Sequence, residues 1–304
     1  MIWMLFSSMV FLWVFLPICL IGYHLIHPKY RNVFLLIASL LFYAWGEPKF
    51  VFLMIFSIVV NYIFAILVED NPKHRKTYLI LGIVFNLLLL GYFKYFNFII
   101  DNINLVLNAH ITVETVILPI GISFFTFQIM SYLIDVYRDP KIKAQRNILD
   151  LGLYIALFPQ LIAGPIVKYK DIEKELSERS VSLDDFAYGV KRFIIGLGKK
   201  VILSNNLAVT VDLIFAQNIS EMSSIVLWLG IIGYAFQIYY DFSGYSDMAI
   251  GLGRMFGFHF QENFNYPYIS SSIKEFWRRW HISLSTWFKE YLYIPLGGNR
   301  GGRC

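Results

Sequence analysis

The stretch from Ser272 to Arg300 contains the residues whose types and spacing are best suited to chemistry. If this stretch forms one continuous helix, with successive residues about 100° apart, its side chains separate into two faces. His281 falls at the boundary between an aromatic face and a cationic face. The first face comprises Ile273, Phe276, Trp277, Trp280, Leu284, Trp287, Phe288 and Tyr291, and the second comprises Lys274, Arg278, Ser285 and Lys289.

This arrangement is typical of a site, with His281 as the candidate catalytic residue. An imidazole has an ordinary pKa of about 6.5, so near neutral pH it can accept a proton from a hydroxyl group. Arg278 and Lys274 could offset negative charge on a carbonyl oxygen or bind an anionic substrate, and Ser285 shares their face. A basic helix with bulky aromatic residues also lies flat at a lipid headgroup boundary, and His281 would then be incidental.

Two further groups of polar residues lie inside apolar runs. Gln128, Ser131 and Asp135 share one helical face, and Gln237 and Asp241 share another. An ionisable side chain inside a membrane span costs at least about 2.5 kcal/mol, so such residues should face a cavity or one another. Gln128, Asp135, Gln237 and Asp241 are therefore candidates for substrate binding. The alternative is that they only hydrogen-bond neighbouring helices.

The composition predicts an integral, polytopic membrane protein of the all-α class. Hydrophobic residues make up 57% of the chain and charged residues only 15%, with a mean hydropathy of +0.57. Soluble domains carry about 25% charged residues, so this chain has too little charge for a surface that faces water. The net charge of +5 does not indicate a nucleic-acid partner, because the basic residues lie in short loops where they set topology in the bilayer.

We expect one membrane domain over residues 1–304, with about five spans in residues 1–137. An excess of Lys and Arg places loops 27–32, 69–77 and 138–150 in the cytoplasm. The expected spans are Ile2–Ile26, Val33–Trp45, Phe50–Val68, Tyr78–Ile100 and Val116–Tyr137.

Residues 138–224 do not follow this simple pattern. After a cytoplasmic loop, Leu151–Val167 contains two prolines and a glycine, which predicts a broken or re-entrant segment. Phe186–Leu203 carries four basic residues and is expected to be an amphipathic helix, either at the cytoplasmic surface or packed within the protein. Residues 225–304 are expected to form a late span, from Ile225 to Met255, followed by the histidine-bearing amphipathic helix.

Other catalytic and binding motifs are absent from the sequence. It contains no phosphate-binding loop, no Gly-x-Ser-x-Gly elbow, no His-Glu-x-x-His and no Cys-x-x-Cys. The other five histidines have no metal-ligand spacing, so we expect neither a metal nor a resident cofactor.

The run from Gln237 to Arg300 resembles the signature of the membrane-bound O-acyltransferase family. It is most similar to the bacterial alginate O-acetyltransferase branch, which is related to the protein that transfers D-alanine to teichoic acid. Three earlier blocks, Leu40–Phe50, Leu118–Arg138 and Leu157–Tyr169, also resemble that branch. Together these blocks touch most of the chain, and the Trp280–His281 block is highly specific.

The resemblance implies a ring of membrane helices, with re-entrant and amphipathic helices, around a central tunnel. It implies an enzyme of the bacterial inner membrane that takes an acyl group, usually acetyl, from a cytoplasmic thioester such as acetyl-CoA or an acyl carrier. The acceptor would be a hydroxyl of an exported cell-surface polysaccharide, and a periplasmic or extracellular partner is expected.

The resemblance also assigns His281 to the upstream of two family histidines. The downstream histidine, usually regarded as essential, belongs to a Trp-His-Gly motif that the printed sequence does not contain. The sequence is therefore similar to the N-terminal two-thirds of such an enzyme, and we expect a C-terminally truncated chain.

Two other function classes remain open. Asp135, Asp241 and the broken segment would also suit a transporter, although the paired interrupted segments typical of secondary transporters are not found. A truncated, non-catalytic copy would serve only as a membrane scaffold.

Overall fold

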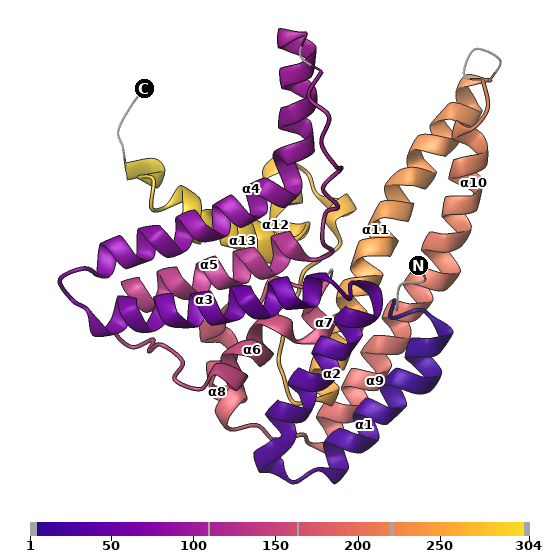
Figure 1. Cartoon of the computed structure of the whole chain (residues 1–304). Helices are drawn as coiled ribbons and strands as arrows, with labels where there is room; N and C mark the ends of the chain where they lie inside the picture. The colour runs from indigo at the N-terminus through magenta and orange to yellow at the C-terminus, as the bar shows by residue number, and fades with distance from the viewer. Residues whose placement is uncertain (1–4, 109, 163, 219–221, 301–304) are drawn as a thin grey trace. The chain divides into compact units, whose positions relative to one another are not determined.

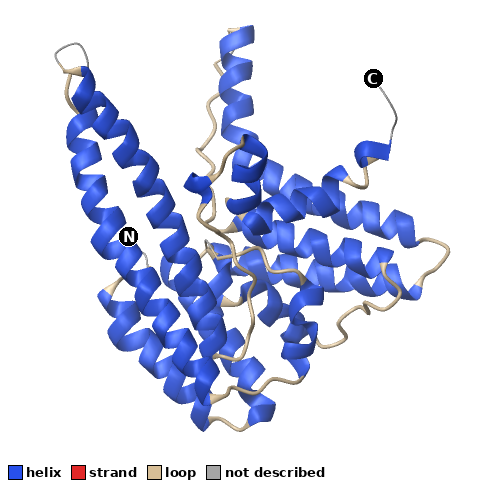
Figure 2. Cartoon of the chain, turned by 180° about the vertical axis from the view of Figure 1, so that it is seen from behind, coloured by secondary structure: helices blue, strands red, loops and turns tan. Residues whose placement is uncertain are grey.

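The computed structural model describes residues 5–108, 110–162, 164–218 and 222–300, which form helices and loops without a strand (Figures 1 and 2). The all-α fold class is therefore confirmed. Within these ranges, four helices are long and apolar enough to cross a membrane: Phe50–Asp70, Arg75–Leu107, Leu183–Phe215 and Ser224–Met255.

The chain divides into two compact units, which are described separately. The first consists mainly of residues 28–162 with residues 168–173, and the second mainly of residues 3–27 and 174–304 with residues 163–167. The expected single membrane domain, and the ring and tunnel, stay predictions.

The first unit is a helical bundle around a buried central helix. Its helices are α2 (Arg31–Gly46), α3 (Phe50–Asp70), α4 (Arg75–Leu107), α5 (Ile122–Arg138), α6 (Ile148–Ala156) and α7 (Phe158–Leu161), followed by the start of α8 (Tyr169–Ser177). Helices α3, α4 and α5 lie side by side (Figure 1), and most residues of α5 are buried.

Helix α5 begins six residues later than the predicted span. Gly121, the residue before it, has a left-handed φ of +75°, and a Cβ there would lie 2.6 Å from the carbonyl oxygen of Leu161. Only glycine accepts this combination of backbone conformation and close contact without strain. Hydropathy could not show this boundary, because residues 116–120 are mostly apolar although they are not helical.

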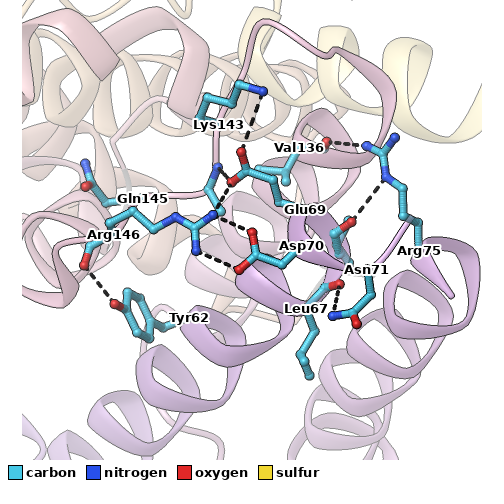
Figure 3. Close-up of polar contacts among 12 residues, drawn as sticks. Tyr62, Leu67, Glu69, Asp70, Asn71, Arg75, Val136, Lys143, Gln145 and Arg146 are labelled. Atoms are coloured by element: carbon cyan, nitrogen blue, oxygen red, sulfur yellow. Dashed lines mark hydrogen bonds and ion pairs between the residues drawn. The ribbon is translucent and has the colours of Figure 1, made fainter. Parts of the chain in front are cut away.

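The predicted cytoplasmic loop after α5 is held to the end of α3 by ion pairs (Figure 3). The Arg146 guanidinium lies 2.6 Å from Asp70 and 3.1 Å from Glu69, and Glu69 also accepts a hydrogen bond from the Ala144 backbone N–H.

Arg75 donates to the carbonyl oxygens of Val68 and Val136, which lie near the C-terminal ends of two helices. Helix ends leave such carbonyls unpaired, so Arg75 acts as a cap for both.

The segment predicted to be broken is interrupted at Leu157, between α6 and α7. Pro159 lies in the first turn of α7, and the Phe158 backbone N–H donates to the Ser39 hydroxyl at 3.1 Å. Residues 151–161, from the second turn of α6 to the end of α7, are all buried. The side-chain hydroxyl thus satisfies a buried backbone group that the break leaves without a helical partner.

The second unit is built around a long helical pair. Its helices are η1 (Phe11–Phe15), α1 (Leu16–Leu25), α9 (Leu183–Gly198), η3 (Lys199–Ser204), α10 (Asn205–Phe215), α11 (Ser224–Met255), α12 (Ile273–Arg279), α13 (Ile282–Trp287) and η6 (Phe288–Tyr293). The first predicted span began at Ile2, but residues 1–4 lie outside the described residues.

Helices α9 and α10 form one rod through the π-helical turn η3, and this rod packs along α11 (Figure 1). The amphipathic helix predicted over Phe186–Leu203 is therefore part of a longer rod, Leu183–Phe215, which is long and apolar enough to cross a membrane. Its predicted place at the cytoplasmic surface or within the protein stays a prediction. The predicted end at Leu203 falls within this π-helical turn, after which α10 continues the rod to Phe215.

Glycines bring α9 and α11 into backbone contact. A Cβ on Gly196 would lie 2.6 Å from the Gly244 carbonyl oxygen, and one on Gly189 would lie 2.7 Å from the Gly251 carbonyl oxygen. Small residues at these positions let two helices approach closely, as they do in membrane helix pairs.

We expect Gly196→Ala to lower the free energy of unfolding by about 1–3 kcal/mol, because the added methyl must push two backbones apart. The matched control is Gly198→Ala, where no described heavy atom lies within 4 Å of the added Cβ. Thermal unfolding in detergent should show a lower midpoint for the first variant and an equal or higher midpoint for the second. Equal midpoints would contradict the close packing.

Candidate functional site

The histidine-bearing stretch is not one continuous helix, so the predicted division into two faces is wrong. Helix α12 ends at Arg279, and His281 adopts a left-handed conformation with φ 44° and ψ 56° before α13 begins at Ile282. Instead of continuing the helix, the Ile282 N–H donates to the Asn263 carbonyl oxygen at 2.9 Å. A left-handed non-glycine residue is uncommon, and such strain often occurs at functional sites.

The His281 ring lies between an amide and an aromatic ring. Its Nδ1 is 3.1 Å from Asn263 Oδ1, and its centroid is 4.7 Å from that of Phe242 in an edge-to-face arrangement. Phe264 then contacts both Phe242 and Trp280, with centroids 5.0 and 5.1 Å apart. The aromatic rings around His281 therefore differ from the predicted face: Phe242 and Phe264 come from other segments of the chain, and only Trp280 belongs to the predicted set.

Asn263 is a fully buried residue that sequence reasoning did not single out. Its Oδ1 accepts from the Ser283 N–H at 3.2 Å and the Ser283 hydroxyl at 2.9 Å, and its Nδ2 donates to Ser246 Oγ at 3.0 Å. The residue lies inside the run that resembles the family signature. A neutral amide carries no charge or periodicity signal, so only its presence in that run could have suggested a role.

A cavity of about 760 Å³ lies beside this network, and Ile282, the chain neighbour of His281, forms part of its wall. The lining combines ionic groups, aromatic rings and an amide. The lining residues are Arg192, Ile195, Lys199, Tyr239, Tyr240, Asp247, Glu262, Phe264, Asn265, Tyr266 and Ile282.

The ionic groups of the cavity pair with one another. Asp247, whose side chain is 8% exposed, lies 2.6 Å from both the Arg192 guanidinium and the Lys199 ammonium, and Arg192 also lies 2.5 Å from Glu262. The two positive and two negative charges sum to zero. Arg192 and Lys199 are seven residues apart, so they lie on the same face of a helix. This spacing in the sequence could have predicted that the two cations share one partner.

Among the predicted binding residues of α11, Asp241 forms an ion pair with Lys200 of η3, and Gln237 accepts from Ser204 Oγ through its backbone carbonyl at 3.2 Å. Neither residue lines the cavity. Both contacts link α11 to η3, as expected if these polar groups only connect neighbouring helices. A role of Asp241 or Gln237 in substrate binding stays a prediction.

Lys274 and Arg278 lie on the other side of the helix break from Ser285. They line a second cavity of about 520 Å³ together with Asn265, which also borders the first cavity. Ser285 lies in α13, where its N–H donates to the His281 carbonyl oxygen at 3.1 Å. The structure therefore brings His281 and Ser285 together through the backbone, while Lys274 and Arg278 border separate space.

Gln128 and Asp135 lie on the buried helix α5 of the first unit. The Gln128 carbonyl oxygen accepts from Ser131 Oγ at 2.8 Å and from the Tyr154 hydroxyl at 3.3 Å. A shared site with His281, which belongs to the second unit, stays a prediction. In the described part of the chain, no group of three or more His, Cys, Asp or Glu side chains could hold a metal ion.

Burial lowers the pKa of His281 from its ordinary value to about 4. Removing the imidazole from water penalises its charged form, so the ring is neutral at pH 7. A neutral imidazole retains a lone pair that can accept a proton, but its lowered pKa makes it a weaker base than an ordinary histidine.

Comparison with known proteins decides the family. Residues 44–303 match the family model described as MBOAT, membrane-bound O-acyltransferase family. The chain belongs to this family. Membership, together with the four long apolar helices, confirms the predicted multi-pass membrane protein, and the recognition of the family from its motifs was correct.

Several MBOAT relatives match nearly the whole chain. The probable alginate O-acetylase of Pseudomonas syringae pv. tomato is 49% identical over 308 residues, which cover 99% of this chain and 59% of that protein. The peptidoglycan O-acetyltransferase of Helicobacter pylori is 39% identical over 98% of this chain and 62% of that protein. The teichoic acid D-alanyltransferase of Bacillus subtilis is 31% identical over 58% of this chain and 45% of that protein. The chain thus spans about three-fifths of the length of the alginate O-acetylases that it matches.

We expect Asp247→Asn to lower the free energy of unfolding by about 3 kcal/mol, the lower end for a broken buried pair, because Lys199 loses its carboxylate partner while Arg192 keeps Glu262. Asp241→Asn is the matched control, since it breaks a Lys–Asp pair on the same helix whose carboxylate side chain is 50% exposed. Its effect should be clearly smaller. The unfolding midpoints of the two variants are compared by thermal unfolding in detergent. Equal decreases in the midpoint would contradict the role of Asp247 as the buried partner of two cations.

The lowered pKa of His281 predicts a specific pH dependence. Between pH 6.5 and 4 the unfolded chain binds a proton at this residue and the folded chain does not, so stability falls as the pH falls through this range. His281→Asn lacks this titration. As the pH drops from 7 to 4.5, the unfolding midpoint of the unaltered protein should therefore fall more than that of His281→Asn. A constant difference would mean that His281 is not buried.

Proposed function

We propose that this chain belongs to a membrane O-acyltransferase that acts on an exported polysaccharide, and that His281 takes part in its site. The observation that carries the proposal is the His281 imidazole, which is neutral and held by Asn263. Neither residue lines the cavity, but Ile282 and Phe264, which follow them directly in the chain, do. The names of the MBOAT relatives, which include O-acetyltransferases of two different polymers, support the same reaction class.

In the proposed reaction, His281 accepts the proton of an acceptor hydroxyl as its oxygen attacks the carbonyl carbon of a thioester. An ester bond forms, the carbon–sulfur bond breaks, and the thiol leaves with a proton. A positioned base speeds such an attack by about 10²–10⁴-fold. The acyl group would be acetyl, and the donor would be acetyl-CoA or an acyl carrier on the cytoplasmic side.

The cavity walls suit a hydroxyl-rich acceptor. Carboxylates accept hydrogen bonds from sugar hydroxyls, while guanidinium and amide groups donate to sugar oxygens. Tyr239, Tyr240 and Phe264 offer aromatic surface in the same wall. Because the paired charges of Arg192, Lys199, Asp247 and Glu262 cancel, the cavity itself does not select for a charged polymer.

The remaining parts of the proposal concern location and partners. We place the protein in the bacterial inner membrane, with a periplasmic or extracellular partner that helps to deliver acyl groups to the polymer. Membership in an acyltransferase family favours this function over transport. A non-catalytic scaffold remains the alternative that the following experiment separates.

We expect His281→Ala to abolish O-acetylation. The chain is continued by the C-terminal part of an alginate O-acetylase, which supplies the downstream Trp-His-Gly histidine. This protein is expressed in a bacterium that lacks its own alginate O-acetylase but exports the unmodified polymer, and ester-linked acetate on that polymer is measured by NMR. The unaltered chain should restore acetate, the His281→Ala variant should not, and a matched change at the exposed His110 should leave acetate normal. Normal acetate with His281→Ala would overturn the role of His281, and no acetate with the unaltered chain would favour the scaffold.

A further inference from the structure

We propose that Asn263 is a positioning residue that fixes the tautomer and orientation of His281. Its side-chain oxygen holds the proton of His281 on Nδ1 and so leaves the lone pair on Nε2. The inference rests on the proposed function, because it states which nitrogen acts as the base in that reaction.

The orientation of the Asn263 amide follows from a backbone group. The Ser283 N–H can only donate, and it lies 3.2 Å from the atom assigned as Oδ1. That atom must therefore be the carbonyl oxygen, and the amide nitrogen must be the atom 3.0 Å from Ser246 Oγ. Exchanging the two would place an N–H group against another N–H donor.

The tautomer of His281 follows from this orientation. A carbonyl oxygen only accepts hydrogen bonds, so the Nδ1 that lies 3.1 Å away must carry a hydrogen. In a neutral imidazole the lone pair is then on Nε2. When the ring takes up a proton during the reaction, both nitrogens become donors, so the contact with Asn263 is kept in both states.

Several segments of the second unit hold Asn263 in place. Its side chain reaches Ser246 on α11 and Ser283 on α13, and its backbone carbonyl accepts from Ile282. The Ser283 hydroxyl in turn accepts from the Ile166 N–H at 3.0 Å, which leaves its own hydrogen for Asn263. Asn263 is fully buried, so water does not compete for these bonds. A rigid partner of this kind fixes ring orientation as well as protonation.

The tautomer is tested on the purified 304-residue chain in detergent, labelled with ¹⁵N-histidine. The His281 resonances are assigned by their loss in His281→Gln. We expect a protonated Nδ1 and an unprotonated Nε2 in the unaltered chain, and a shift toward Nε2 protonation in Asn263→Ala. The matched control is Asn86→Ala, which removes another fully buried asparagine, bonded to Asn61 in the first unit, and should leave the His281 signals unchanged.

Activity provides the second measurement. Asn263→Ala should reduce acetate transfer by about 100-fold, the lower end of the contribution of a positioned base. Asn263→Asp keeps an acceptor oxygen, so it should restore part of the rate. Its negative charge favours the imidazolium, so the acid side of its pH–rate profile should move to higher pH. Asn86→Ala should leave the profile unchanged even where it lowers the amount of folded protein.

The two proposals fail in different ways. An unchanged His281 tautomer in Asn263→Ala would overturn the role of Asn263, as would a pH–rate profile that does not move in Asn263→Asp. An altered tautomer in Asn263→Ala combined with normal acetate in His281→Ala would instead overturn the proposed function of His281.

Discussion

The ion pairs between α9, η3 and α11 can form only because two helix backbones come into contact. Gly196 and Gly244 allow that approach, and Asp247 follows Gly244 by one helical turn. At this distance Arg192 and Lys199 both reach the Asp247 carboxylate. Charges removed from water are tolerated when they are paired closely, so the packing and the electrostatics at this point depend on each other.

The same helix supplies one wall of the candidate site. Asp247 and Tyr239 of α11 face the cavity, and Ser246, next to Asp247, bonds Asn263. The loop after α11 then provides the amide that holds His281. A change that moves α11 away from α9 would therefore disturb both the ionic wall and the histidine, although α9 carries no residue that contacts the imidazole in the described bonds.

Sequence reasoning was accurate where the signal was composition or a motif. The low fraction of charged residues predicted the helical membrane class, and the run around Trp280–His281 identified the family. It failed where a single residue changes the backbone. His281 is a polar residue in an amphipathic pattern, and periodicity alone cannot show that it adopts a left-handed conformation and divides the helix. Asn263 was missed for a related reason, because its importance comes from partners at positions 246, 281 and 283 that only the fold brings together.

The left-handed backbone at position 281 also restricts which residues evolution can place there. After glycine, asparagine, aspartate and histidine itself adopt this conformation most readily, whereas valine and isoleucine would clash with their own backbone. Substitutions at position 281 that keep the turn unstrained are therefore limited to a few side chains. Homologues that had lost the imidazole could keep the same turn, and hence the same architecture, by using one of those residues.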